Sequence, residues 1–177
     1  MFGYDAPRWH AVLNDLPVAL LLAAVLFDLA GALFKRESLK WASIWTLWAG
    51  VIGGWAAVVA GKLAEEALEH GEAIHELMER HERLGLITMG VFTVILAWKM
   101  YRRFALPAAE EAVTRLLGVV GLAGIIWVGS IGGKLVFEHA AGVSNERLRA
   151  ELIDRKAMPA DTAAGHEHAP GTPAHKH

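Results

Sequence analysis

Residues 12–34 read VLNDLPVALLLAAVLFDLAGALF, a stretch in which three polar side chains, Asn14, Asp15 and Asp28, interrupt the apolar ones. A helix rises about 1.5 Å per residue, so about 20 residues cross the roughly 30 Å hydrocarbon core of a bilayer. Three further apolar runs follow at residues 41–61, 84–100 and 116–137, and the last two reach this length with their flanks. The chain therefore predicts an all-α bundle of four transmembrane helices.

The composition excludes several classes of protein. The chain has no cysteine, which excludes disulfides, thiolate metal sites, iron–sulfur clusters and covalently attached haem c. A net charge of −2 without a basic stripe predicts no nucleic-acid partner. No catalytic triad, phosphate loop or nucleotide fingerprint is present, so an electron-transfer or accessory subunit is expected rather than a stand-alone enzyme.

Charged residues in the connecting loops indicate the orientation. Positive side chains gather after the first and third apolar runs: Lys35, Arg36, Lys40, Lys99, Arg102, Arg103 and Arg115. Positive loops stay in the cytoplasm, whereas the glutamates of the second loop have little weight. Both termini are therefore expected outside, which for a protein of the bacterial inner membrane means the periplasm. The first run is expected to be retained, because its flank is barely basic and no cleavage site follows.

The second half of the chain repeats the first at a spacing of about seventy residues. Residues 9–10 align with 80–81, and residues 61–63 align with 133–135. Two tandem hairpins in the same orientation imply a pseudo-twofold axis along the membrane normal. Binding sites tend to form at the interface between such repeats.

Four histidines mark the helix ends that share the outer face: His10, His70, His81 and His139. Residues three, four and seven apart share a helix face, and each of the four shares one with apolar residues. His75 shares its face with glutamates and is expected in solvent. The pattern indicates a haem or metal site at one membrane surface. The plainer alternative is that interfacial histidines anchor the helix ends.

The spacing leaves the ligand open, because imidazole binds haem iron, copper, nickel and zinc. Two histidines on facing helices would hold a haem b axially, with His81 and either His139 or His10 as the expected ligands. Three or four converging histidines would instead hold a divalent transition metal ion. The protein would then bind or handle that metal. A third alternative is a structural accessory subunit of a larger membrane complex.

Charged residues near the histidines have two interpretations. Lys62 and Lys134 lie near the outer ends of their helices, where lysine commonly extends to the headgroups. Under the haem alternative they would face the anionic propionates. Glu69 and Glu138 precede two of the histidines and could accept a hydrogen bond from the second ring nitrogen.

Asp28 lies deep in the first predicted helix, where a carboxylate is costly and requires a partner. Lys40 and Arg103 are the expected partners, in a structural ion pair rather than a proton relay. Asp15 lies near His10 in the same helix and is expected within hydrogen-bonding reach of the site.

The chain becomes polar after the fourth apolar run. Residues 1–143 are expected to form the membrane domain, 144–158 a short polar surface segment and 159–177 a disordered tail rich in Ala, Pro, Gly and His. The tail carries two His-x-His pairs, which are His166, His168, His175 and His177. Spaced pairs of this kind are typical of weak metal capture, and a neutral tail is the alternative.

Residues 10–143 resemble a family of small predicted bacterial membrane proteins catalogued as domain of unknown function 2231. In that family the first helix opens with His-Pro and continues with an Asn-His-Phe-Pro-like stretch, and His10 and Pro17 match it at the right separation. The family's histidine at the start of helix three resembles His81. Its Gly-Gly-x-Leu-Val-x-x-His close resembles residues 132–139.

Two positions depart from the family pattern. Ala11 replaces the proline, and Asp15 stands where the family has a second histidine. If that histidine is a ligand in the family, this chain has lost it or changed its metal. Some members look fused to c-type cytochrome domains, which implies electron transfer. The resemblance therefore favours a haem b protein in the lipid bilayer, working with other membrane subunits and a periplasmic electron carrier.

Overall fold

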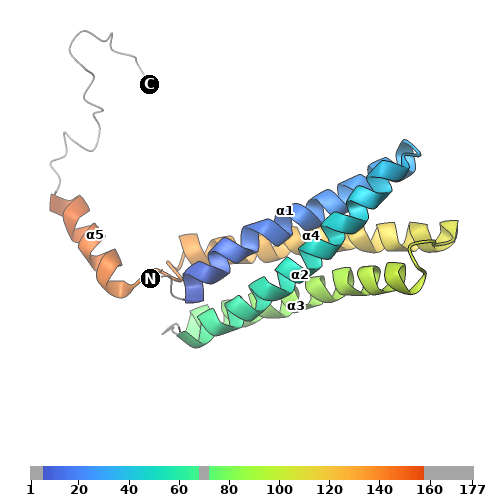
Figure 1. Ribbon diagram of the computed structural model, residues 1–177. Coiled ribbons are helices and arrows are strands. Elements are labelled where there is room, and N and C mark those ends of the chain that lie inside the picture. Colours follow the sequence, from blue (N-terminus) through green and yellow to red (C-terminus); the bar gives the residue numbers. More distant parts are fainter. Residues whose placement is uncertain (1–5, 68–71, 158–177) are drawn as a thin grey trace, which may run out of the picture. The chain divides into compact units, whose positions relative to one another are not determined.

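The computed structural model describes residues 6–67 and 72–157. They form five helices: α1 (Ala6–Leu33), α2 (Glu37–Ala67), α3 (Glu72–Tyr101), α4 (Ala108–Phe137) and α5 (Asn145–Ala157). The described residues up to Gly142 and those from Val143 onward make two separate compact units, and the first contains α1–α4. Each of these four helices is long and apolar enough to cross a membrane. The predicted all-α bundle of four membrane helices is confirmed (Figure 1).

Short turns join the two helices of each hairpin. Lys35 adopts a positive φ of 52° after α1, and Arg103 and Phe104 adopt 50° and 62° after α3. This left-handed conformation commonly closes the C-terminal end of a helix. The amide of Phe104 donates to the carbonyl oxygen of Lys99 across the second turn. The basic residues of both predicted loops thus lie at the same end of the bundle.

The hairpins α1–α2 and α3–α4 share equivalent helix contacts, although α1 and α2 pack against each other much more extensively than α3 and α4 do. Two close helix contacts recur 71 residues later, Leu21–Gly50 as Phe92–Gly121 and Pro17–Gly53 as Thr88–Gly124. Between the hairpins, α2 packs against α3 and α1 packs against α4. A pseudo-twofold axis between the hairpins produces this arrangement, as the internal repeat predicted.

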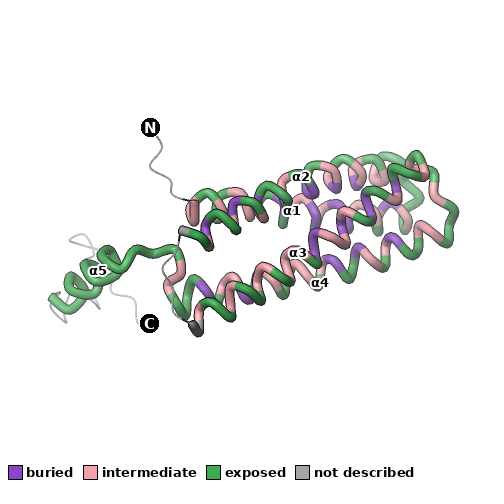
Figure 2. Tube along the Cα trace, turned by 90° about the horizontal axis from the view of Figure 1, so that it is seen from below, coloured by how far each residue is buried: buried purple, intermediate pink, exposed green. Residues whose placement is uncertain are grey.

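The core lies between the hairpins. Phe92 is fully buried, and Leu21, Leu47 and Leu96 pack in the same cluster. In Figure 2 the buried positions of α1–α4 (purple) alternate along each helix with exposed ones (green). Large apolar side chains on the outer sides stay exposed, such as Trp45 at 70%. An apolar outer surface of this kind suits contact with lipid.

Glycine lets the helices of a hairpin approach closely, and a substitution at Gly121 tests whether this close approach needs glycine. A Cβ at Gly121 would lie 2.7 Å from Phe92 Cζ. We expect Gly121→Ala to lower the free energy of unfolding by about 1–3 kcal/mol through overpacking. Gly129→Ala is the matched control, because nothing lies within 4 Å of its Cβ position. Thermal unfolding in detergent measures both, and equal melting temperatures would contradict the packing.

Candidate functional site

His10 on α1 and His81 on α3 lie side by side, at the end of the bundle away from the two turns. Their ring centroids are 6.3 Å apart, and the ring planes make an angle of 86°. Both side chains are half-buried. The structure therefore brings together two of the four histidines that the sequence singled out.

The same kind of hydrogen bond holds each imidazole within its own hairpin. His10 Nδ1 lies 2.9 Å from the carbonyl oxygen of Ala57 on α2, and His81 Nδ1 lies 3.1 Å from that of Val128 on α4. A carbonyl oxygen only accepts hydrogen bonds, so Nδ1 carries the proton and donates it. In a neutral ring the lone pair of Nε2 is then free, which is the arrangement typical of metal-bound histidine.

A glycine makes room for each imidazole. A Cβ on Gly61 would lie 3.0 Å from His10 Nδ1, and a Cβ on Gly132 would lie 3.1 Å from His81 Cε1. Each glycine lies four residues, or about one helical turn, beyond the carbonyl that accepts the bond. A unit of histidine, carbonyl and glycine thus occurs once in each hairpin, with a spacing of 71 residues for all three parts.

His139 does not join this pair. α4 ends at Phe137, and His139 lies exposed in the turn that follows. Across residues 6–67 and 72–157, no three side chains of His, Cys, Asp or Glu come together as a metal site. Asp15 is exposed as well. The other predicted ligands lie outside the described residues: His70, His166, His168, His175 and His177.

The helix contacts correct one part of the alignment between the two halves of the chain. The sequence comparison matched Gly61 to Gly133, whereas the contacts with histidine make Gly132 its equivalent. Lys62 and Lys134 are therefore not equivalent. Lys62 Nζ lies 2.5 Å from Glu82 Oε1 on α3, whereas Lys134 is exposed. Apolar helices align almost equally well at neighbouring offsets, and only packing distinguishes them.

Sequence reasoning missed the groups that orient the imidazoles. Glu138, which could accept a hydrogen bond from a nearby histidine, is exposed, and backbone carbonyls orient both rings of the pair. Glu69 lies outside the described residues. Every residue carries a carbonyl, so no sequence pattern could single out two of them. The signal that was available is the glycine one turn further along the helix.

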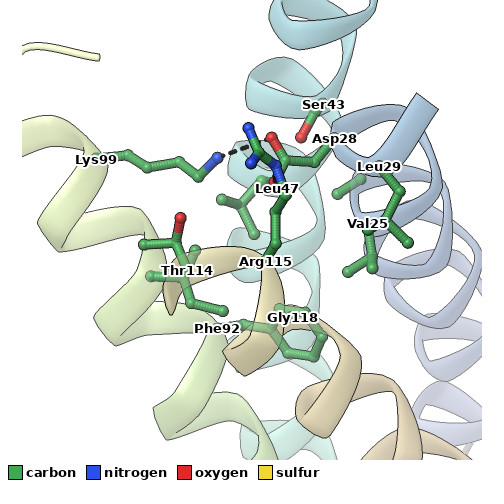
Figure 3. A pocket seen from close by; sticks show the side chains of 12 residues that line it. Val25, Asp28, Leu29, Ser43, Leu47, Phe92, Lys99, Thr114, Arg115 and Gly118 are labelled. Atoms are coloured by element: carbon green, nitrogen blue, oxygen red, sulfur yellow. Dashed lines mark hydrogen bonds and ion pairs between the residues drawn. The ribbon is translucent and has the colours of Figure 1, made fainter. Parts of the chain in front are cut away.

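A second polar cluster lies nearer the turns, between α1, α3 and α4 (Figure 3). Asp28 Oδ1 is 3.2 Å from Lys99 Nζ, and Asp28 Oδ2 is 3.6 Å from Arg115 Nε. The three side chains are only 14%, 11% and 20% exposed. Two cationic side chains thus balance the charge of the Asp28 carboxylate inside the bundle, as a charged group within a membrane requires.

The partners expected for Asp28 were wrong. Lys40 Nζ lies 3.4 Å from Glu111 Oε1 instead. Lys99, rather than Lys40 or Arg103, pairs with Asp28. Both ion pairs join residues 71 apart, so each links two equivalent positions of the repeat. Equivalent positions meet only near the pseudo-twofold axis. There the two hairpins carry opposite charges.

A cavity of about 20 Å³ borders this cluster and is lined by Asp28, Ser43, Lys99, Arg115 and apolar neighbours. That volume suffices for one water molecule. Arg115 Nε is buried and has no hydrogen-bond partner within the described part of the chain. The cluster is therefore a compact charge network beside a water-sized space, without room for an organic ligand.

Removing one charge of this network should lower the free energy of unfolding more than removing both members of an ion pair. We expect Asp28→Leu to lower the free energy of unfolding by about 3–5 kcal/mol, because Lys99 then lacks its buried counter-charge. Asp28→Leu with Lys99→Leu should recover most of that loss. Arg115 keeps Glu111 at 2.5 Å in both variants. Thermal unfolding provides the comparison, and an additive loss in the double variant would contradict the pairing.

Comparison with known proteins agrees with this architecture. No curated protein and no solved structure matches the chain. A family model described as "Predicted membrane protein (DUF2231)" matches residues 8–145, which span all four membrane helices and both histidines of the pair. The match covers most of the chain, as the sequence resemblance predicted. The protein therefore belongs to the predicted membrane protein family DUF2231.

Proposed function

We propose that the protein is a membrane-embedded b-type haem protein that passes electrons near the periplasmic face, and that His10 and His81 are the residues that would hold the haem iron. The observation that carries the proposal is the pair of imidazoles from α1 and α3. Each has its Nδ1 bound to a backbone carbonyl and its Nε2 free for a ligand.

The spacing of the pair supports a shared metal. A histidine nitrogen binds a metal at about 2.0–2.1 Å with the ring centre about 1 Å behind it, so the centroids of two imidazoles that share one metal lie at most about 6 Å apart. The observed 6.3 Å is close to this distance. Haem iron is already bound by the porphyrin and needs only one or two ligands from the protein. An ion such as zinc takes three or four protein ligands instead. Two histidines therefore favour haem.

The chain's own residues would hold and tune the group. A bound haem would supply one-electron transfer. The hydrogen bonds from Nδ1 to Ala57 and Val128 would orient the imidazoles and raise the basicity of Nε2. The glycines at 61 and 132 would keep both rings in place. Lys62 is held by Glu82, so a role opposite the propionates would require that ion pair to open.

The charge distribution supports a periplasmic site. The basic residues Lys35, Arg36, Arg102 and Arg103 lie at the turn end of the bundle, opposite the histidine pair. With these turns in the cytoplasm, the pair would face the periplasm of a bacterial inner membrane. A periplasmic electron carrier could then approach it, and other membrane subunits could pack on the exposed apolar faces.

An absorption spectrum of the detergent-purified protein tests the proposal. We expect a Soret band and, after reduction with dithionite, the sharp α and β bands of low-spin haem b. His10→Ala and His81→Ala should each remove the low-spin spectrum, because each deletes one of the two imidazoles that would hold the iron. His139→Ala is the matched control and should leave the bands unchanged. A featureless spectrum of the wild-type protein, also after incubation with haemin, would overturn the proposal.

The glycine beside each ring provides a finer test. Gly132→Ala would push a methyl group against His81, so we expect haem affinity to fall by about 10–100-fold, as for other disturbed supporting groups. Gly133→Ala is the control on the next residue, where nothing lies within 4 Å of the Cβ position. Haemin titration followed by absorbance measures both affinities. A similar loss in the two variants would argue against the role of Gly132.

A further inference from the structure

We propose that α5 lies on the surface of the membrane that α1–α4 span and binds anionic lipid headgroups through one face of the helix. This lipid face consists of Leu148, Arg149, Leu152, Ile153 and Lys156. The inference goes beyond the proposed function and does not depend on a haem.

The five side chains of the lipid face recur at helical spacing. Leu148 and Leu152 are four residues apart, as are Arg149 and Ile153, and Lys156 comes four residues after Leu152. Residues three, four and seven apart lie on one side of a helix. All five side chains are exposed, and three of them are large and apolar. One side of α5 therefore presents leucine and isoleucine together with two cations.

Both charged residues of the lipid face are cations. Arg149 and Lys156 lie among its apolar side chains, and none of the three carboxylates of α5 belongs to this face. Long cationic side chains reach the phosphates of a bilayer while their apolar stems and neighbours lie deeper. Anionic lipid attracts each such cation near its surface. The face thus matches phosphates above hydrocarbon, the surface to which amphipathic interfacial helices bind.

The carboxylates of α5 lie elsewhere on the helix. Glu151 and Asp154 lie on the opposite side together with Arg147, and Glu151 accepts a hydrogen bond of 2.8 Å from Arg155. Glu146 is in the first turn, where a carboxylate stabilises the helix dipole. Outside the lipid face two arginines stand against three carboxylates. The positive charge of α5 is therefore concentrated on the lipid face.

The chain after α4 stays at the end of that helix. α4 ends at Phe137, and Ala140 adopts a positive φ of 53°, so the chain turns back there. The amide of Ala141 donates to the carbonyl oxygen of Leu135, at 2.9 Å. This hydrogen bond holds the chain at the level where α4 leaves the bilayer.

The next residues keep the start of α5 at the same level. The Cβ position of Gly142 lies 3.6 Å from Pro7 Cβ, in the first turn of α1. Three residue steps link Gly142 to Asn145, the first residue of α5, and they span at most about 10 Å. Chain connectivity therefore keeps the start of α5 within about 10 Å of the ends of two membrane helices, and the lipid surface is within its reach.

A lipid surface also accounts for the persistence of a short polar helix. α5 has 13 residues, and none of them is buried. Isolated helices shorter than about 12–15 residues are only marginally stable in water. The carbonyl oxygen of Ser144 accepts from the amide of Leu148, which closes the first turn but supplies no packing. Burial of the apolar side chains in the interface would supply the missing stabilisation.

Nitroxide labels on single cysteines test the proposal, because the chain has no other cysteine. The full-length protein is placed in nanodiscs of phosphatidylcholine and phosphatidylglycerol in equal parts. Leu148→Cys and Leu152→Cys carry the label on the lipid face, and Ala150→Cys and Asp154→Cys carry it on the other side. Electron paramagnetic resonance measures how accessible each label is to oxygen, which concentrates in lipid, and to a water-soluble nickel chelate.

We expect the two labels on the lipid face to favour oxygen and the two on the other side to favour the nickel chelate. Equal access of the chelate to all four labels would overturn the proposal, because α5 would then lie free in water. Labels on the lipid face that are shielded from both probes would overturn it as well. Protein would then cover this face, either the membrane domain or a second copy of the chain.

Two arginines on different sides of α5 provide matched charge variants. In the protein labelled at Leu152→Cys, we expect Arg149→Glu to lower the ratio of membrane-bound to free label at least about fivefold, the effect of one cation near an anionic surface. Nanodiscs of phosphatidylcholine alone should also lower this ratio. Arg147→Glu makes the same charge change on the other side and should alter the ratio less than about twofold. Equal losses in the two variants would contradict binding through the lipid face.

Discussion

The interface between the two hairpins is the constraint on which the rest of the structure depends. Hydrocarbon offers no hydrogen bonds, so each polar group inside the bundle must find its partner within the protein. The pseudo-twofold arrangement places equivalent residues near one another along the axis. His10 meets His81 at one end, and Asp28 meets Lys99 nearer the other. The apolar cluster around Phe92 and Leu21 packs between the hairpins.

The two ion pairs near the pseudo-twofold axis require that the two hairpins differ in sequence. Two identical hairpins would bring Asp28 against a second aspartate and Lys40 against a second lysine. Here Lys99 and Glu111 stand at those equivalent positions, so both contacts become attractive. A buried ion pair adds little net stability, but one charge without its partner is costly. Opposite charges at equivalent positions therefore favour pairing of the first hairpin with the second.

The histidine site shows where the repeat is kept and where it is broken. The ring, the carbonyl and the glycine are the same in both hairpins, and these are the parts that would hold a ligand. The residues next to them differ, with Lys62 and Glu82 on one flank and Gly133 and Ala11 on the other. The groups that contact the imidazoles are therefore repeated, whereas the residues beside them are not.

Hydropathy alone determined the four membrane helices, because each apolar run, with its flanks where needed, is long enough to cross a bilayer. The sequence also put His10 and His81 on apolar helix stripes, and the structure brings these two rings side by side, although α3 begins at Glu72 and His81 does not open it. Only the tertiary structure decided that His139 lies apart, that Asp28 pairs with Lys99, and that the repeat is 71 residues rather than 72 at its glycines. These depend on how far each helix extends and how two hairpins rotate against each other, and local sequence patterns carry neither quantity.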